Sequence, residues 1–417
     1  MTYARASLAH ESLEEHDVLK GLKIVDCDAH FTEPPDLWTS RVPASLQSRV
    51  PVQRTVDGFT AWYIGEQPFA SIGGNTIDLD HRKVLGTQTL QPWGQIDEAS
   101  WNVDARLALL DEMGVYAQIL YPNAVGFASN SMFGISDIAL RNVVQEAYND
   151  FLVDVQRQSG DRLFPQAVLP IWDMALTVKE MSRLHDQGIT GFTLTDKPHV
   201  VGMPDLDAAY FAPMWSLANE IGAVINFHIG SGGIRQMESE DFGSPVSGPK
   251  PDIYWESFGP QRRLAILATQ FYMSNVRIIS NLCMSNMFDL YPNVKIASAE
   301  SGIGWIPFVL EAIEYQLDQM VTDPAEVRLQ SRRPKEYFRD HIFVMFWFEH
   351  IGPTKLLGDI GINNVLVETD IPHPTCIYPA TKDRIAAVMA DLDPASRRRV
   401  LQDNAVDLYK LPIRTDE

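Results

Sequence analysis

Short apolar segments recur along the chain, and amphipathic segments lie between most of them. Apolar runs of this length, bounded by turn residues, are typical of buried β-strands. We predict eight strands, which lie within the segments LKIVDCD, VYAQILYP, LFPQAVLPI, ITGFTLT, GAVINFHIG, NVKIASAES, HIFVMFWFE and NNVLVETDIPHP.

The segments between the predicted strands have the apolar periodicity of helices that bury one face. Examples are NVDARLALLDEMG, IALRNVVQEAYNDFLVDVQRQSG and ALTVKEMSRLHDQG, and each ends at a glycine, which is common at a helix C-terminus. Eight strands that alternate with helices predict an α/β fold, a (β/α)8 TIM barrel. A doubly wound open sheet is the alternative.

Two segments do not follow this alternation. Residues from about 41 to 89 are rich in Pro and Gly, and DGFTAWYIGEQPF has the pattern of a hairpin that turns at Gly65. We therefore predict a small β-insertion after the first strand. The stretch from about 230 to 260 is predicted to be a long loop, and such loops usually cover a site or a partner surface. With these additions, residues 1–417 are predicted to form a single barrel domain.

The composition narrows the classes of partner. The 417 residues carry a formal net charge of −20, with a pI near 4.9, so nucleic acids and anionic membranes would be repelled. The three cysteines are far apart, the N-terminal stretch lacks the apolar core of a signal peptide, and no apolar run could span a bilayer. We expect a cytoplasmic protein that acts on a small molecule.

Polar side chains gather where several predicted strands end, which is where catalytic residues lie in a barrel. Asp28 and His30 follow the first strand, His228 the fifth, Glu300 the sixth and Asp370 the eighth. Buried polar groups are costly unless something pairs with them. Imidazoles and carboxylates that converge on one face would suit a divalent metal such as Zn, Mn or Fe. Taken singly, each is explained as well by a satisfied polar residue or, for Asp370, by a cap on the next turn.

The segments IVDCDAHFTEPPDLW, INFHIGSG, KIASAESGIGWIP and VLVETDIPHP carry a family resemblance. Together they resemble the amidohydrolase-related, metal-dependent enzymes of the aminocarboxymuconate semialdehyde decarboxylase type, over residues from about 23 to 411. The resemblance implies a (β/α)8 barrel with one divalent metal, Zn or Mn, bound by Asp28, His30, His228 and Asp370. It also implies that Asp370 handles a proton. Resorcylate and carboxyvanillate decarboxylases share the group, so the resemblance does not select one reaction.

Glu300 departs from that family pattern, because decarboxylases of the group usually have a histidine at this position. A third carboxylate beside Asp28 and Asp370 would disfavour an anionic aromatic acid, and it suits a general base that acts on a metal-activated water. We therefore expect a metal-dependent hydrolase acting on a small cyclic or aromatic substrate. A nonoxidative decarboxylase, a carboxy-lyase of an aromatic or enoic acid, is the alternative. A structural salt bridge would be a simpler role for Glu300.

Three further residues are candidates for substrate binding. Arg235 could meet a substrate carboxylate, Trp305 could form an aromatic wall, and His373 could orient Asp370. Each has a simpler explanation, as a solvated loop arginine, a core aromatic and a loop histidine. Dimers are common in the family, so a homodimer stays open. A non-catalytic barrel that serves as a binding module is the alternative from another class.

Overall fold

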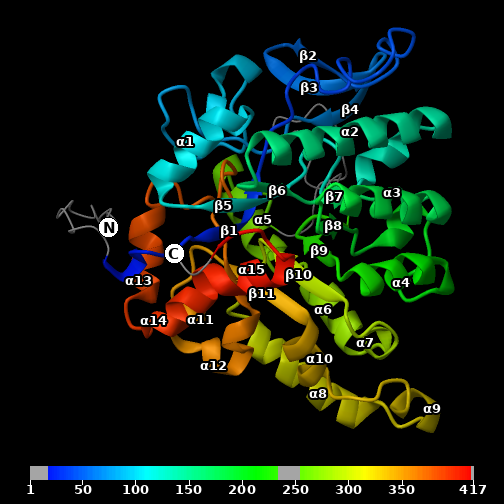
Figure 1. Ribbon diagram of the computed structural model, residues 1–417, viewed down its shortest axis with the longest axis vertical. Coiled ribbons are helices and arrows are strands. Elements are labelled where there is room, and N and C mark those ends of the chain that lie inside the picture. Colours follow the sequence, from blue (N-terminus) through cyan, green and yellow to red (C-terminus); the bar gives the residue numbers. More distant parts are fainter. Residues whose placement is uncertain (1–16, 233–253, 415–417) are drawn as a thin grey trace.

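The computed structural model describes residues 17–232 and 254–414, and its centre is a ring of parallel strands (Figure 1). The strands are hydrogen-bonded in the order β1–β5–β6 and β7–β8–β9–β10–β11–β12. Their bounds are β1 Val25–His30, β5 Ala117–Tyr121, β6 Leu163–Pro165, β7 Ala167–Val168, β8 Gly191–Thr193, β9 Val224–His228, β10 Lys295–Ala299, β11 Ile342–Phe346 and β12 Val365–Val367.

The two sheets join into a barrel at both of their borders. β6 and β7 follow one another with only Gln166 between them, so they occupy one position in the ring. At the other border, Ala29 of β1 forms a parallel bridge with Ile371, just beyond β12, and the His30 amide donates to the Ile371 carbonyl at 2.8 Å. Each of the eight predicted segments contains a strand, and the (β/α)8 barrel prediction is confirmed.

Helices surround the strands, and their ends follow the expected capping rules. The side chains of Asn102, Asp137 and Asp173 accept from the first turns of α1, α2 and α3. The helices are α1 Val103–Met113, α2 Ile138–Gln158, α3 Met174–Asp186, α4 Ala212–Ile221, α5 Pro260–Phe271, α6 Val276–Cys283, α7 Met287–Leu290, α8 Ile306–Met320, α9 Pro324–Val327, α10 Pro334–His341, α11 Ile351–Lys355, α12 Leu357–Ile360, α13 Thr381–Met389, α14 Pro394–Arg398 and α15 Asn404–Tyr409. None of the helices in the described ranges is both long and apolar enough to cross a bilayer.

The predicted β-insertion is a three-stranded antiparallel sheet that lies beside α2 (Figure 1). Its strands are β2 Val52–Val56, β3 Phe59–Ile64 and β4 Gln67–Ser71, and the second turn is at Gly65, whose φ is 58°. Trp62 of β3 packs edge-on against Trp38 at 4.7 Å between ring centroids, which anchors the sheet to the barrel. Most of the predicted long loop, residues 233–253, is outside the described residues.

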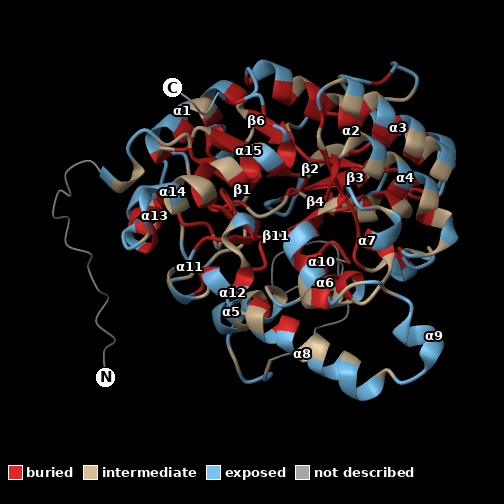
Figure 2. Ribbon diagram, turned by 60° about the horizontal axis from the view of Figure 1, so that its bottom comes forward, coloured by how far each residue is buried: buried red, intermediate tan, exposed pale blue. Residues whose placement is uncertain are grey.

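Burial separates the strands from the outer helix faces, which alternate between buried and exposed positions (Figure 2). Inside the barrel, Asn226 of β9 forms a closed polar network. Its amide donates to Gln166 Oε1 at 2.7 Å, and its oxygen accepts from the Tyr121 and Tyr409 hydroxyls at 3.0 and 2.7 Å. The polar groups in the middle of the barrel therefore satisfy one another.

Candidate active site

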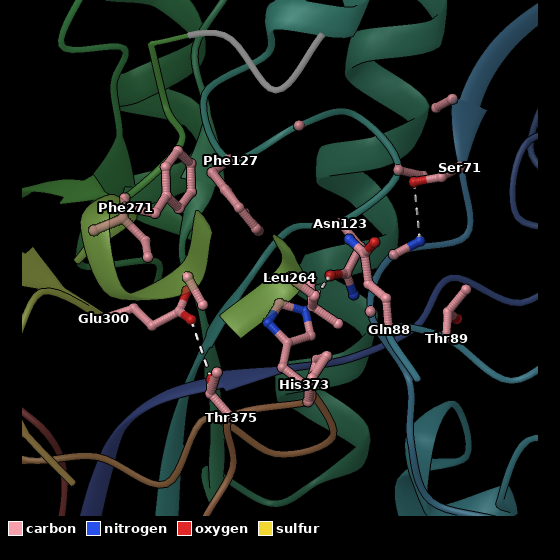
Figure 3. Close-up of a pocket in the computed structure, with 18 of the residues that line it drawn as sticks. Ser71, Gln88, Thr89, Asn123, Phe127, Leu264, Phe271, Glu300, His373 and Thr375 are labelled. Carbon is pink, nitrogen blue, oxygen red and sulfur yellow. Dashed lines mark hydrogen bonds between the residues drawn. The ribbon is translucent and has the colours of Figure 1, made fainter. Parts of the chain in front are cut away.

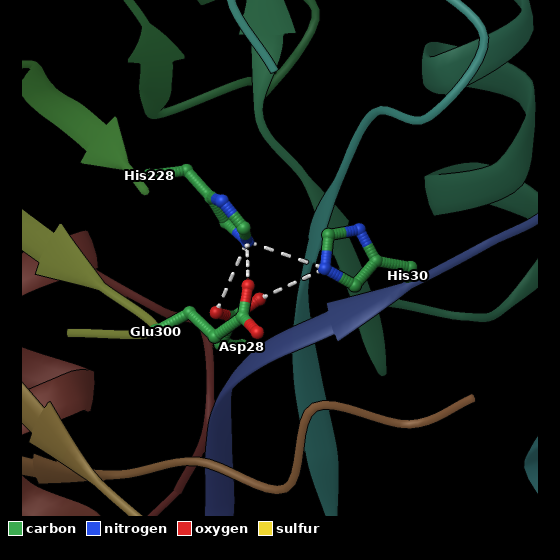
Figure 4. Close-up of side chains that lie close together, drawn as sticks. All are labelled: Asp28, His30, His228 and Glu300. Atoms are coloured by element: carbon green, nitrogen blue, oxygen red, sulfur yellow. Dashed lines mark hydrogen bonds and ion pairs between the residues drawn. The ribbon is translucent and has the colours of Figure 1, made fainter. Parts of the chain in front are cut away.

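The end of β1 sends its polar side chains to two different places. Asp26 accepts from the Thr369 amide at 2.7 Å and from Gln118 Nε2 at 2.7 Å, so it ties the segment after β12 to β5. Asp28 and His30 point into the mouth of the barrel and are fully buried. Asp26 thus has structural partners, whereas Asp28 and His30 face the mouth of the barrel (Figure 4).

Three other strands bring side chains to the same place. His228 is the last residue of β9, Glu300 follows β10, and Asp370 follows β12. Glu300 and Asp370 have left-handed backbones, with φ of 52° and 60°. Such a conformation costs on the order of 1 kcal/mol or more for a residue with a Cβ, and strained residues of this kind cluster at functional sites. Both carboxyl groups reach the cluster from these strained positions.

Four side chains meet closely at the barrel mouth (Figure 4). The Nε2 atoms of His30 and His228 are 3.3 Å apart. Asp28 lies 3.5 Å from the His30 nitrogen and 3.4 Å from the His228 nitrogen, and Glu300 Oε2 lies 3.4 Å from the latter. Asp370 Oδ1 is 3.6 Å from His30 Nε2. Five groups from four strands thus face one small volume.

Burial and crowding set the protonation of these groups. Burial raises the pKa of Glu300 well above its usual range, and the charges of Asp370 and Asp28 add to this effect. Burial and Asp370 also raise the pKa of Asp28. Burial lowers the pKa of His228, but the charge and hydrogen bond of Asp28, the Ile229 carbonyl and the charge of Asp370 together outweigh it, so the net shift of this pKa is upward. A bound cation would stabilise the ionised form of carboxylates that are this crowded and this deeply buried.

The donor set fits a divalent cation. Neither oxygen of Asp28 has a hydrogen-bond partner among the described residues, although both are buried. The His228 Nδ1 lies 2.7 Å from the Ile229 carbonyl, which can only accept, so Nδ1 carries a proton, and in the neutral ring that binds metals Nε2 presents its lone pair to the cluster. One ligand atom from each of Asp28, His30, His228 and Glu300 lies within 4.8 Å of the others, and the same holds for His30, Glu300, Asp370 and His373. This buried group could bind one metal ion.

His373 and Thr375 form the side of the cluster that faces outward. His373 Nδ1 lies 3.0 Å from Asp370 Oδ1, its ring stacks on His30 at 3.6 Å, and its Nε2 lies 3.2 Å from Asn123 Oδ1. The Thr375 hydroxyl contacts the carboxylates of both Asp370 and Glu300. Asp370 is therefore held by two side chains that follow it closely in the sequence.

A cavity of about 1000 Å³ opens onto this outer side (Figure 3). Glu300, His373 and Thr375 line its inner end, and Phe127 and Phe271 stand beside them. Ser71, Gln88 and Thr89 of the insertion lie on the opposite side. The cluster is thus accessible to a ligand through a largely apolar space, which is typical of an enzyme active site.

The sequence comparison agrees with this architecture. Residues 25–411 match the profile of the family described as amidohydrolase. The chain belongs to the amidohydrolase family. The family assignment made from the four sequence segments is therefore confirmed, and the protein is a metal-dependent enzyme of this superfamily. No curated protein matches the amidohydrolase chain.

Solved structures with the same fold are distant in sequence. An amidohydrolase from Mycobacterium avium subsp. paratuberculosis is 18% identical, with 95% of this chain and 99% of that chain covered and a TM-score of 0.67. The 5-carboxyvanillate decarboxylase of Novosphingobium aromaticivorans, solved with manganese, is 14% identical, with 96% and 100% covered and a TM-score of 0.61. The 2,6-dihydroxybenzoate decarboxylase from Rhizobium is 19% identical, with 94% and 99% covered and a TM-score of 0.57. At these identities the likeness supports the TIM-barrel fold of the amidohydrolase.

The structure brings most of the predicted site residues of this amidohydrolase together. The six that meet in the cluster are Asp28, His30, His228, Glu300, Asp370 and His373. Trp305 is not among the described residues that line the cavity, because its indole donates to the Ser301 carbonyl at 2.7 Å and its ring packs against the core. Its substrate-binding role has no support from this geometry. Arg235 lies outside the described residues, so its role stays a prediction.

Sequence reasoning missed several supporting residues. Glu368 accepts from the Glu300 amide at 3.1 Å, and Thr375 contacts the carboxylates of Glu300 and Asp370. Glu33 accepts from the amides of Asn123 and Ala124, at 3.0 and 2.9 Å. It therefore fixes the loop that contains Asn123, and Asn123 in turn contacts His373. The segments HFTEPP and VETDIPHP contained Glu33 and Glu368, and two glutamates in otherwise buried strand-end segments were the available signal.

Proposed function

We propose that this amidohydrolase is a metal-dependent nonoxidative decarboxylase of an aromatic or enoic acid. The sequence alone favoured hydrolysis, on the charge of Glu300. The observation that now carries the proposal is the apolar cavity that meets the carboxylate–imidazole cluster, with Phe127 and Phe271 beside Glu300. Structural neighbours named as decarboxylases of 5-carboxyvanillate and 2,6-dihydroxybenzoate support the same choice.

Loss of CO2 and hydrolysis make different demands on a site. Decarboxylation breaks the bond between the carboxylate carbon and the ring or alkene carbon, which keeps the electron pair and takes up a proton. The negative charge of the substrate, which is confined to the carboxylate at first, becomes delocalised over the ring or alkene. A water-free, apolar wall favours this delocalisation. Hydrolysis concentrates charge on one oxygen and requires fixed donors there. Apolar lining beside the cluster therefore suits decarboxylation better.

The residues that would hold the metal are the ones whose donor atoms converge. Asp28, His30 and His228 would bind it, because their donor atoms and one of Glu300 lie within 4.8 Å of one another. Asp370, whose Oδ1 lies 3.6 Å from His30 Nε2, would complete the ligand set, with Glu300 at the cavity side. A bound divalent cation would stabilise negative charge on the substrate oxygens. These ligands are fixed by strand ends, so they present a rigid surface to the substrate.

A proton donor for the carbon that loses CO2 lies at the cavity side of the cluster. Asp370 contacts Thr375 and lies 3.0 Å from His373 Nδ1, and both partners line the cavity. His373 can pass a proton between the cavity and Asp370, because its ring lines the cavity and its Nδ1 faces the Asp370 carboxylate, while the Asn123 oxygen holds the ring in place through Nε2. We assign proton delivery to Asp370 and its replenishment to His373. Glu300 would position the substrate through its contact with the same threonine.

Hydrolysis remains the second candidate, and Glu300 is the observation that favours it. A buried carboxyl group 3.4 Å from His228 Nε2 is within reach of a water molecule in the cluster. In this reaction Glu300 would take the proton of the attacking water, and Asp370 would protonate the leaving group. Ester, lactone and amide substrates would then be cleaved.

The two reactions are separated by their products. The enzyme, reconstituted with Mn or Zn, is supplied with aromatic and enoic acids in one series and with the corresponding lactones, esters and amides in another. We expect CO2 release, and in D2O one deuterium at the carbon that bore the carboxylate. Acid release from the second series, without CO2 from the first, would overturn the decarboxylase proposal in favour of hydrolysis. Metal content measured by plasma mass spectrometry checks that the site is loaded.

A further inference from the structure

The size and lining of the cavity indicate how long and how polar its ligand is. About 1000 Å³ is the upper end of the range of roughly 300–1,000 Å³ that is usual for sites of drug-sized ligands. The part of the cavity beside Glu300, His373 and Thr375, called the reacting end below, is only a small share of this volume. A single aromatic ring with one carboxylate would leave most of the cavity to water.

Apolar side chains extend far from the reacting end. Leu85 and Val200 line the cavity and are 76% and 60% exposed, which is unusual for large apolar residues. Phe69, Phe133 and Leu264 line it as well and are half-buried. Covering such a wall is favourable by about 25 cal/mol per Å² of apolar surface, and only a ligand that reaches these residues gains that free energy.

The insertion and α5 form two walls along the length of the cavity. At the inner end, a Cβ on Gly74 would lie 2.8 Å from the His373 ring, so the insertion passes directly against the cluster. Further out, Gln261 at the start of α5 lies 3.5 Å from the Gly86 carbonyl of the insertion. The segment 74–86 therefore runs from the reacting end to α5, and a bound ligand would lie along it.

Few charged side chains line the cavity, which fits a ligand with an apolar body. Among the described lining residues, Lys197 is the one lysine or arginine, and Glu300 is the one carboxylate. Lys197 lies near Val200 in the sequence, in the part that carries the exposed apolar side chains. Apart from Lys197 and Glu300, the described lining carries no lysine, arginine or carboxylate, so most of the wall is suited to an uncharged, apolar body.

We propose that the substrate is an extended, largely apolar acid, considerably longer than a single aromatic ring, that lies between the insertion and α5. The acid reacts at the cluster, and its apolar body contacts Leu85, Val200 and Leu264. The identity of the reacting group rests on the proposed decarboxylase function, whereas the length and the apolar character of the body rest on the cavity alone.

The test is a binding measurement that needs no turnover. Affinities of the metal-loaded enzyme for benzoate and for biphenyl-4-carboxylate are measured by isothermal titration calorimetry. We expect the longer acid to bind at least tenfold more tightly. In Ala268→Trp, an indole from α5 would fill the cavity, so this advantage should disappear while benzoate binding is kept. Ala312→Trp, on a half-buried position of α8 outside the lining, is the matched control and should keep the advantage.

A second variant guards against misfolding of Ala268→Trp. Leu85 is exposed, so Leu85→Asp should fold normally and should lower the affinity for biphenyl-4-carboxylate by about fivefold or more, with little effect on benzoate. Equal affinities for the two acids in the wild-type enzyme would overturn the proposal, as would an advantage that survives both variants. CO2 release from single-ring acids with no preference for length would contradict this inference alone. Length-selective binding without any CO2 release would contradict only the decarboxylase assignment.

Discussion

The barrel contains two buried polar regions, and they differ in how their hydrogen bonds are satisfied. In the middle, Asn226 is paired on both sides of its amide, with Gln166, Tyr121 and Tyr409. At the mouth, both oxygens of Asp28 are buried and have no hydrogen-bond partner in the described part of the chain. The first region stabilises the fold by itself, whereas the second is complete only with an additional group. Stability and function are thus carried by different polar sets in one barrel.

The largest effect is expected at the mouth. Asp28→Asn should lower turnover by at least about 10³-fold, some 4 kcal/mol in the barrier, because a metal ligand becomes neutral. Stoichiometric metal should be lost at the same time. The free energy of unfolding in the presence of a chelator should not fall, because the change removes a crowded buried charge. Turnover within tenfold of wild type with full metal content would contradict the proposed site.

The middle of the barrel should behave in the opposite way. Asn226→Ala leaves the Tyr121 and Tyr409 hydroxyls and the Gln166 oxygen without their partner. We expect the free energy of unfolding to fall by about 3 kcal/mol, measured by urea denaturation with a chelator present. Gln319→Ala, at an exposed position of α8, is the control and should change it by less than about 0.5 kcal/mol. If the free energy of unfolding of Asn226→Ala fell by as little as that of the control, the two regions would not differ in the way described.

A substitution at Glu300 tests whether its carboxyl group takes part in the reaction. Glu300→Gln should keep the metal. If Glu300 is the base of hydrolysis, kcat should fall by about 10²-fold, because the amide cannot exchange a proton. If Glu300 positions the substrate for decarboxylation, the loss should be smaller, because a glutamine oxygen can still accept from Thr375. Glu349→Gln is a matched control: Glu349 accepts from the Ile303 and Gly304 amides near the same barrel end, outside the cluster. A glutamine oxygen can accept the same bonds, so its kcat should stay within about twofold. Equal rates in both variants would leave Glu300 a structural role.

The smallest effect is expected at Glu33, which acts through the loop that carries Asn123. One oxygen of Glu33 accepts all three of its bonds, from the amides of Asn123 and Ala124 and from the Tyr148 hydroxyl. Glu33→Gln keeps that acceptor and should retain wild-type kcat. Glu33→Ala should lower kcat about tenfold, or 1.4 kcal/mol, with KM little changed, because His373 loses its fixed neighbour. If kcat of Glu33→Gln fell as much as kcat of Glu33→Ala, the charge of Glu33 would matter and its positioning of the loop would not.

The local pattern of the chain determined the fold and part of the site. Strand and helix periods are properties of neighbouring residues, so the eight strands and the insertion with its turn at Gly65 could be predicted. The barrel then requires strand ends to meet at one mouth, which placed Asp28, His30 and His228 together before any distance was known. Asp26 shared their alternation, yet it serves as a structural tie to Thr369, because hydrogen-bond partners are not encoded by alternation.

Only the tertiary structure shows which residues hold the cluster in place and which segments line the cavity beside it. Asn123 meets Glu33 and His373, which are 90 and 250 residues away in the chain, and such contacts depend on barrel closure and loop packing. The cavity is formed by the insertion, by α5 and by loops between strands, and its volume follows from their relative positions. The sequence could therefore predict the reactive groups, because strand ends are local features. It could not predict the shape of the substrate, because that shape is set by segments that approach one another only in the folded chain.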